Sequence, residues 1–175
     1  RGTPVYPSAN IGKTETTGLD LNFGYQNDFS ENISLSTNVS FTTADNLVKE
    51  IANGDKYIWG AGYGIPYNNL VRFQEGESPG IFWGYLTDGI FQNQAEIDAH
   101  ATQPNAVPGD IRYVDVNGDG RVDADDRTKI GDPFADFYIG WNFNLKAYNF
   151  DLSVTTYGSF GNDIFRGYER NLNYT

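Results

Sequence analysis

The chain has 175 residues, a formal net charge of −11 at pH 7, and neither cysteine nor methionine. An acidic chain without a basic stripe is unsuited to neutralising phosphates, which excludes nucleic-acid binding, and the lack of cysteine excludes disulfides and thiolate metal sites. No run of about 18 apolar residues occurs, so no transmembrane helix is expected, although the strands of a membrane barrel carry a far weaker signal.

The chain opens with RGTPVYPS, without an initiator methionine or a signal peptide, and is expected to be a piece of a longer protein. Two alternating segments follow, at residues 18–27 and 32–42. Their apolar positions are Leu19, Leu21, Phe23 and Tyr25 in the first segment and Ile33, Leu35, Val39 and Phe41 in the second. A period of two predicts two strands, each with one apolar and one polar face, joined by the hairpin-like connection NDFSEN.

The middle of the chain is expected to be less regular. Residues 43–80 are rich in Gly, Asn and Asp, whereas residues 80–92, GIFWGYLTDGIFQ, are apolar enough for another strand. Asn93, followed three residues later by Glu96, resembles a capping box and predicts one short helix ending near His100.

Residues 115–126, DVNGDGRVDADD, have the spacing of a calcium loop. Asp115, Asn117 and Asp119 occupy loop positions 1, 3 and 5, Arg121 offers its carbonyl oxygen at position 7, and Asp126 occupies position 12. Side chains at alternating positions of a tight turn bring several oxygens onto one small sphere, which suits a hard cation. The spacing predicts a structural Ca²⁺; the alternative is an acidic turn without an ion, since these residue types also favour turns.

Two further alternating segments, residues 136–147 and 150–160, are predicted to be strands joined tightly at Tyr148-Asn149. Several of the predicted strands reach about 9–11 residues, the length that a tilted strand needs to cross a bilayer. Alternation alone is compatible with a soluble sandwich, whose apolar face turns inward. It is equally compatible with a membrane barrel, whose apolar face meets lipid.

Catalysis finds little support in the sequence. Cysteine is absent, the single histidine, His100, has no evident partner, and no nucleophile elbow occurs. The chain is therefore not expected to be an enzyme.

Several motifs carry a family resemblance. NIGKTETTGLDLNFGYQN, GIFWGYLTDGIFQNQAEIDA, PGDIRYVDVNGDGRVDADDRTKIGDPFADFYIGWNFNLKAYNFDLSV and YGSFGNDIF occur in this order. Together they resemble the late barrel region of SusC/RagA-type TonB-dependent outer-membrane transporters. The resemblance implies an all-β fold in which residues 1–175 supply antiparallel strands to a transmembrane barrel of about 22 strands, with long extracellular loops and one short helix.

The same resemblance implies a place and a function. The chain would lie in the cell outer membrane, in contact with lipid, and would take part in importing oligosaccharides or peptides. A SusD-like surface lipoprotein would act as a lid, and TonB would act through a region outside this chain. The calcium loop would be extracellular, and the aromatic residues Trp59, Tyr63 and Trp83 are candidates for stacking on substrate.

Two alternatives stay open at this point. One is a secreted, calcium-stabilised β-sandwich that binds carbohydrate. The other is a dockerin-like interaction module, although dockerins continue from the DVNGDG stretch into a helix and this chain continues into a strand pattern.

Overall fold

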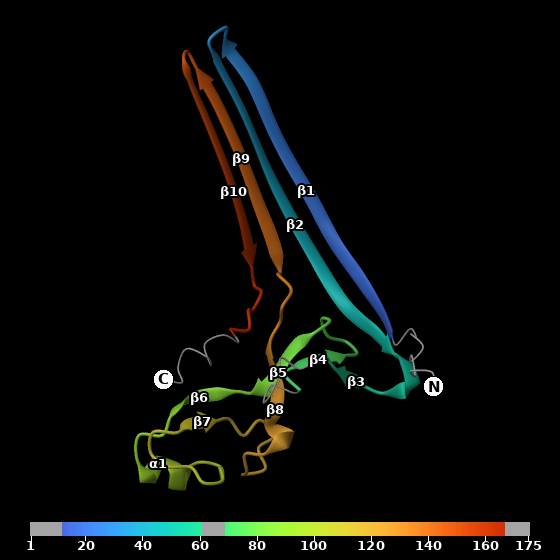
Figure 1. Cartoon of the computed structure of the whole chain (residues 1–175), viewed down its shortest axis with the longest axis vertical. Helices are drawn as coiled ribbons and strands as arrows, with labels where there is room; N and C mark the ends of the chain where they lie inside the picture. Colours follow the sequence, from blue (N-terminus) through green and yellow to red (C-terminus); the bar gives the residue numbers. More distant parts are fainter. Residues whose placement is uncertain (1–11, 61–68, 167–175) are drawn as a thin grey trace, which may run out of the picture. The chain divides into compact units, whose positions relative to one another are not determined.

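The computed structural model describes residues 12–60 and 69–166, in which antiparallel β-strands are the predominant regular structure (Figure 1). Hydrogen bonding defines three sheets, with strand orders β1-β2-β9-β10, β3-β4-β5-β8 and β6-β7. The strands are β1 (Gly12–Ser30), β2 (Ile33–Ile51), β3 (Tyr57–Trp59), β4 (Val71–Gln74), β5 (Ile81–Tyr85), β6 (Thr87–Ile90), β7 (Ile111–Tyr113), β8 (Arg127–Gly131), β9 (Phe137–Ala147) and β10 (Phe150–Phe160). The helical elements are α1 (Gln94–Ala99), η1 (Ala52–Gly54) and η2 (Ala124–Asp126).

The chain divides into two compact units. The first holds the chain up to Ile58, residues 73–79 and the chain from Asp132 onward; the second holds residues 59–72 and 80–131. None of the described helices has the length and apolar character needed to cross a membrane.

The sheet of the first unit has two chemically different faces. Residues directly opposite one another in antiparallel strands share a face, and the register aligns Phe23 with Val39 and Val39 with Trp141. One face is therefore predominantly apolar, and its members include Leu19, Leu21, Phe23, Val39, Phe41, Ile139, Trp141, Phe143, Leu152 and Val154. Leu19, Phe23 and Leu152 are 53, 66 and 51% exposed. These side chains are not packed between two sheets, as the core of a sandwich would require.

Two tight turns close the hairpins of this sheet at the same end (Figure 1). Glu31-Asn32 joins β1 to β2, and Tyr148-Asn149 joins β9 to β10. Tyr148 has a φ of 55°, the left-handed conformation that two-residue hairpin turns demand. Its backbone N–H donates to the carbonyl oxygen of Asn32 at 2.7 Å, so the two turns are tied together.

Strands β1 and β2 run well beyond the segments 18–27 and 32–42 in which apolar alternation occurs. The pairing continues through polar residues, and cross-strand ion pairs link Lys13 to Glu50 and Lys49 to Glu15. A pattern based on apolar residues cannot detect this extension, because ladder hydrogen bonds do not depend on side-chain polarity.

The single strand predicted at residues 80–92 is incorrect. The segment forms two strands, β5 and β6, which belong to different sheets and are separated at Leu86. Gly89 in β6 has a φ of 133°, and the register with β7 shifts between Thr87 and Gly89. A glycine in this conformation permits an irregularity that an uninterrupted strand would not contain.

The second unit contains the predicted short helix. Asn93 caps α1 by accepting a hydrogen bond from the backbone N–H of Glu96 at 3.0 Å, which confirms the capping signal in the sequence. His100 is the C-cap residue of this helix, and its ring meets Phe91 edge-on at 5.3 Å. Phe91 and Ile81 are the most deeply buried apolar side chains among the described residues.

Candidate functional site

The polar face of the β1-β2-β9-β10 sheet is a network of side-chain hydrogen bonds. Asn38 donates to Asn22 at 2.6 Å, and Thr42 donates to Asp20 at 2.6 Å, in both cases between β2 and β1. Further along the sheet, Thr155 on β10 donates to Asn142 on β9 at 3.0 Å. Small polar side chains with spare hydrogen-bonding capacity suit contact with water, whereas the opposite face suits contact with hydrocarbon.

The apolar face contains one polar pair that satisfies itself. The indole N–H of Trp141 donates to the hydroxyl oxygen of Thr37 at 2.9 Å, and this hydroxyl donates to the carbonyl oxygen of Asn142 at 3.2 Å. A buried indole N–H generally needs an acceptor, and an unsatisfied polar group in hydrocarbon costs several kcal/mol. The position of Thr37 in an otherwise apolar row is thereby explained.

In the calcium-like loop, Asp115 holds the turn that follows it. One carboxylate oxygen accepts the backbone N–H of Gly118 at 2.7 Å, and the other accepts that of Gly120 at 2.8 Å. Both glycines have positive φ, 74° and 85°, so the chain reverses sharply around the Asp115 carboxylate.

The next two predicted ligands form successive Asx turns. The side-chain oxygen of Asn117 accepts the backbone N–H of Asp119 at 2.9 Å, and Asp119 in turn accepts that of Arg121 at 2.9 Å. The side-chain N–H of Asn117 also reaches the second oxygen of Asp119 at 3.3 Å. The predicted residues at positions 1, 3 and 5 therefore lie on one tightly wound segment.

Asp126, the ligand predicted at position 12, is engaged by backbone N–H groups of the loop. It is fully buried, and its two oxygens accept backbone N–H groups from Val116, Asn117 and Asp123 at 2.8, 3.3 and 2.8 Å. These bonds, that of Asp123 above all, lower the pKa of the carboxyl below its ordinary value even though burial acts in the opposite direction. Asp126 closes the loop by joining its first residues to its last.

The loop offers carboxylate, amide and carbonyl oxygens, which are the ligand types that a hard cation prefers. Among residues 12–60 and 69–166, no three acidic or histidine side chains lie close enough together to hold a metal ion. However, a carboxylate has about four acceptor positions, and each oxygen of Asp115 and Asp119 receives one hydrogen bond. Asp115, Asn117 and Asp119 therefore keep free acceptor positions, whereas Asp126 is the least available of the predicted ligands.

The loop is attached to the segment after α1. Thr102 and Arg121 form a parallel bridge, in which the N–H of Thr102 donates to the carbonyl oxygen of Gly120 at 2.9 Å and the N–H of Val122 donates to that of Thr102 at 3.0 Å. Val122, the apolar residue that follows Arg121 in the loop, is 7% exposed and packs inward. Order in the loop is thus coupled to order in the segment that follows the helix.

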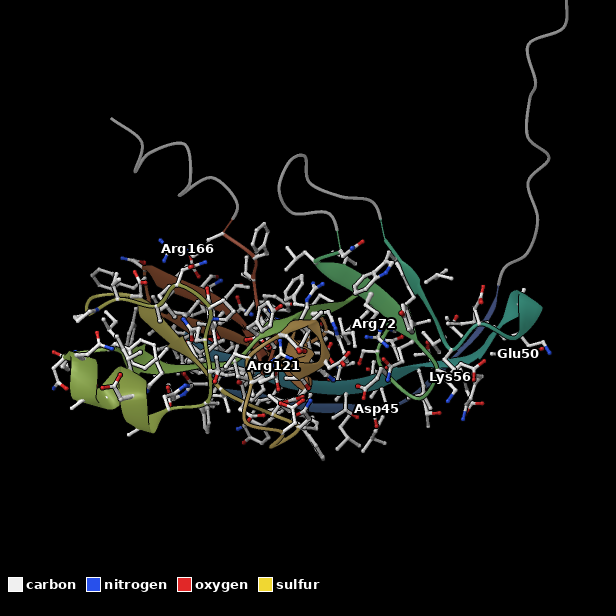
Figure 2. All side chains as sticks on the ribbon, turned by 90° about the horizontal axis from the view of Figure 1, so that it is seen from below. Asp45, Glu50, Lys56, Arg72, Arg121 and Arg166 are labelled. Carbon is white, nitrogen blue, oxygen red and sulfur yellow. The ribbon has the colours of Figure 1, made fainter. Side chains whose placement is uncertain are left out.

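Of the aromatic substrate candidates, Tyr63 lies outside the described residues, and Trp59 and Trp83 contact arginines. The guanidinium of Arg72, which projects from β4 (Figure 2), lies 3.7 Å from the centre of the Trp83 ring and 5.5 Å from that of Trp59. Arg127 lies 5.5 Å from the Trp59 ring. These cation–π contacts place a positive charge over at least part of each indole face.

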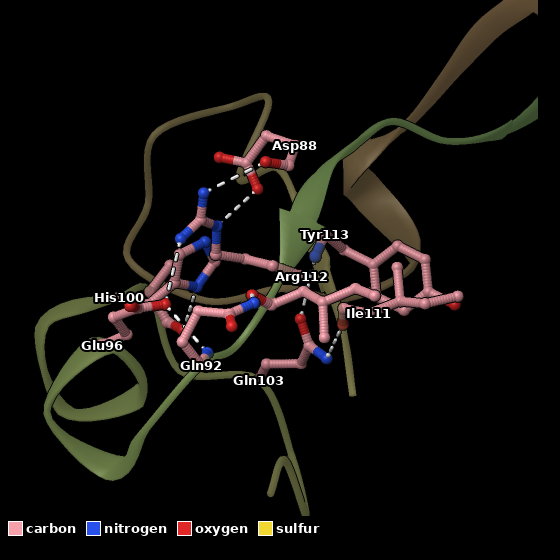
Figure 3. Close-up of polar contacts among 10 residues, drawn as sticks. Asp88, Gln92, Glu96, His100, Gln103, Ile111, Arg112 and Tyr113 are labelled. Carbon is pink, nitrogen blue, oxygen red and sulfur yellow. Dashed lines mark hydrogen bonds and ion pairs between the residues drawn. The ribbon is translucent and has the colours of Figure 1, made fainter. Parts of the chain in front are cut away.

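A polar cluster in the second unit was not anticipated from the sequence (Figure 3). Arg112 on β7 donates to the carboxylate of Asp88 at 2.6 Å, and its guanidinium lies 3.6 Å from the carboxylate of Glu96 on α1. The bond to Asp88 raises the pKa of Arg112. Arg112 therefore connects the β6-β7 sheet to the helix, and because Arg112 and Asp88 are 24 positions apart, no local sequence signal indicates the contact.

Gln103 adds a second connection in the same cluster. Its side-chain oxygen accepts the backbone N–H of Tyr113 at 3.1 Å, and its side-chain N–H donates to the carbonyl oxygen of Ile111 at 2.9 Å. An amide side chain in this way pairs the free edge of β7, as another strand would do.

Comparison with known proteins identifies the class. No family model matches the chain. The chain is 30% identical over 168 residues to the TonB-dependent receptor P3 of Formosa agariphila, a match that covers 95% of this chain and 16% of the receptor. It is 23% identical over 158 residues to the TonB-dependent receptor SusC of Bacteroides thetaiotaomicron, covering 89% of this chain and 15% of SusC. The structure of the RagAB peptide transporter superposes with a TM-score of 0.60 at 17% identity, covering 87% of this chain and 16% of that one.

The fold is thus that of part of a TonB-dependent barrel, and the sheets formed by residues 12–60 and 69–166 do not close. The resemblance to SusC/RagA-type TonB-dependent transporters that the motifs indicated is confirmed. The chain spans about one sixth of the length of the curated relatives that it matches.

Proposed function

We propose that the protein to which these residues belong imports oligosaccharides or peptides across the cell outer membrane in a TonB-dependent manner. The observation that carries the proposal is the two-faced sheet, in which a continuous apolar face lies opposite a hydrogen-bonded polar face. In a transmembrane barrel the first face meets lipid and the second meets the lumen. The relatives named TonB-dependent receptors and the RagAB neighbours support the same conclusion.

The proposed transporter has binding partners and catalyses no reaction. A SusD-like lipoprotein would cover the outer opening, TonB would engage a region outside this chain, and outer-membrane lipid would surround the apolar face. Transport requires binding and release rather than bond cleavage, so the protein is not an enzyme in this proposal. The proteins named in the comparisons are receptors and transporters, in line with this assignment.

We further propose that the loop at residues 115–126 holds a structural Ca²⁺ on the extracellular side. Asp115, Asn117, Asp119 and the carbonyl oxygen of Arg121 would supply oxygens, with Asp126 as a further ligand if its backbone bonds rearrange. The hydrogen bonds of Asp115, Asn117 and Asp119 to the following backbone N–H groups support the proposal, because they hold these residues on one tightly turned segment. A cation would offset the repulsion between the carboxylates and order a segment that has little apolar core of its own.

Trp59, Tyr63 and Trp83 are proposed as substrate contacts within the same function. Trp59 and Trp83 would use the ring surface that Arg72 and Arg127 leave accessible. An arginine held against an indole adds a hydrogen-bond donor to the aromatic surface, which suits hydroxyl or carbonyl groups on a ligand.

The test uses the complete gene in its source bacterium. Deletion of the gene should abolish uptake of at least one labelled oligosaccharide or oligopeptide, and a protonophore should abolish uptake in the wild type. The tagged protein should fractionate with the outer membrane and co-purify with a lipoprotein. Recovery of the protein in the culture medium, or uptake that is unchanged by the deletion for every compound, would contradict the proposed function.

A further inference from the structure

The polar face of the β1-β2-β9-β10 sheet carries an aromatic pair. Tyr138 lies directly opposite Ser159, and Tyr157 lies directly opposite Gly140, so the two tyrosines occupy neighbouring rows of the same face. The other side chains that β9 and β10 contribute to this face are small, amide-bearing or charged groups. Tyr138 and Tyr157 are thus the aromatic side chains that β9 and β10 contribute to an otherwise polar face.

The two rings are stacked. Their centres are 6.2 Å apart and their planes differ by 20°, so the rings lie nearly parallel to each other. Tyr157 is 73% exposed. Gly140, directly opposite Tyr157, adds no side chain beside it, and a Cβ at this position would lie only 2.5 Å from the hydroxyl oxygen of Ser40. The ring of Tyr157 is therefore the accessible part of the pair.

The surroundings of the pair are hydrogen-bonding groups, with one carboxylate, Asp20, in the row of Tyr138. Ser40 and Thr42 on β2 occupy the same two rows as the tyrosines. In the next row, Asn142 uses its side-chain oxygen to accept from Thr155, which leaves its amide N–H groups available. Asp20 on β1, at the same level, is engaged by the hydroxyl of Thr42.

The pair lies far from the tight turns of the sheet. Tyr138 is nine residues before Ala147, the last residue of β9, which corresponds to about 30 Å of strand. In transmembrane barrels of this kind, short turns lie on the periplasmic side and long connections on the extracellular side. In the proposed transporter, the tyrosines are therefore near the extracellular end of the interior wall, where a solute enters.

We propose that Tyr138 and Tyr157 form an aromatic platform that stacks on a neutral sugar ring as it enters the barrel. This inference rests on the proposed import function and narrows its substrate class. The flat apolar face of a sugar ring matches the exposed ring face of the tyrosine stack, and its hydroxyl groups match the amides and hydroxyls in the adjacent rows. Sugar hydroxyl groups can donate to the Asp20 carboxylate and accept from the Asn142 amide, so the mixed surroundings suit a saccharide.

The test measures binding to the detergent-solubilised full-length protein by calorimetry. The probes are neutral hexasaccharides built from glucose, mannose, xylose or galactose, together with an uncharged, end-capped octapeptide of alanine and serine. Tyr138→Ala and Tyr157→Ala should each weaken binding of a hexasaccharide about ten-fold or more, as loss of a central aromatic contact does. Tyr157→Phe, which keeps the ring, should change the dissociation constant less than about three-fold.

Tyr25→Ala is the matched control, because Tyr25 is 53% exposed on the opposite face of the same sheet and should leave saccharide binding unchanged. Each variant is first checked for heat-modifiable migration on gels, which shows that the barrel has formed. The proposal is overturned if no hexasaccharide binds, if both alanine variants bind as the wild type does, or if only the octapeptide responds to them. Outer-membrane fractionation and protonophore-sensitive uptake test the import function separately, so failure of the platform is distinguishable from failure of the transporter.

Discussion

A charge placed on the apolar face offers a quantitative test of the membrane assignment. On β2 this face extends from Ile33, next to the tight turn, to Thr43, and the next outward position is the charged residue Asp45. Ten residue steps at about 3.3 Å, tilted by about 40°, correspond to a height of roughly 25 Å. Val39 is six steps from Ile33, or roughly 15 Å above the lower border, and thus lies within about 3 Å of the midplane.

This depth sets the expected cost. Arginine on the lipid face costs about 2–4 kcal/mol at the midplane and about 0–1 kcal/mol near the interfaces. Val39→Arg should therefore lower the free energy of unfolding by about 2–4 kcal/mol, and Ile33→Arg by about 1 kcal/mol or less. Ser36→Arg is the control, because Ser36 lies on the polar face, beside a hollow formed with Gln26 and Asn144, where a long side chain has access to water.

The assay is denaturant unfolding of the full-length protein in phospholipid vesicles, followed by loss of heat-modifiable gel migration. The membrane assignment predicts the order Val39→Arg, then Ile33→Arg, with Ser36→Arg close to the wild type. If Val39→Arg costs no more than Ser36→Arg, the apolar face does not meet lipid. If Ile33→Arg is the more destabilising of the two outward variants, the centre of the bilayer lies nearer to the tight turns than to Val39.

The remaining predictions concern single contacts. Thr37→Val removes the acceptor of the Trp141 indole N–H and should lower the free energy of unfolding by about 1–3 kcal/mol. In a Trp141→Phe background, the same change should lower it much less. Equal losses in both backgrounds would show that the bond is unimportant for stability. Asp115→Ala should weaken Ca²⁺ binding at least about ten-fold and make residues 109–131 more sensitive to protease in calcium, whereas Asp125→Ala should not; equal behaviour of the two variants would exclude the proposed ligand set. Because its pKa is lowered in the folded loop, Asp126 contributes stability above its ordinary pKa of about 4 that is lost as pH falls further through the lowered value. Hydrogen exchange at Val116 and Asp123 should therefore show constant protection between about pH 5 and 8 and reduced protection below about pH 4, and an Asp126→Asn variant that keeps the full acid dependence would refute this.

Residue alternation and capping signals in the sequence predicted the strands and the helix start that depend on neighbouring residues. Alternation identified which side of β9 and β10 is apolar, and the Asn93–Glu96 spacing identified the start of α1. The outer parts of β1 and β2 were missed because Lys13 and Glu50 pair through charges there, and strand prediction relied on apolar periodicity.

Contacts between distant residues were not predictable in the same way. The sequence places Arg112 next to a calcium-like motif, but its partner Asp88 belongs to another strand, and nothing in either neighbourhood specifies the other. The burial of Asp126 also depends on a contact that the local sequence does not specify. The motif predicts an oxygen at position 12, whereas the direction of the carboxylate depends on how the loop closes on Val116. The cation–π contacts of Trp83 depend likewise on Arg72, eleven residues earlier and on another strand.

The order of the four long strands has a consequence for how this part of the protein is assembled. β1 and β2 are adjacent in sequence, as are β9 and β10, but the bond between Trp141 and Thr37 joins residues 104 positions apart. The two hairpins can form while they are still independent, whereas their union must await the synthesis of everything between them, and such long-range pairing is slow. The register of β2 with β9 is held by contacts between the strands and by the hydrogen bond between the two hairpin turns. The segment between β2 and β9 can therefore diverge in length and composition without changing this register. Recombination between related genes could exchange that segment as a cassette.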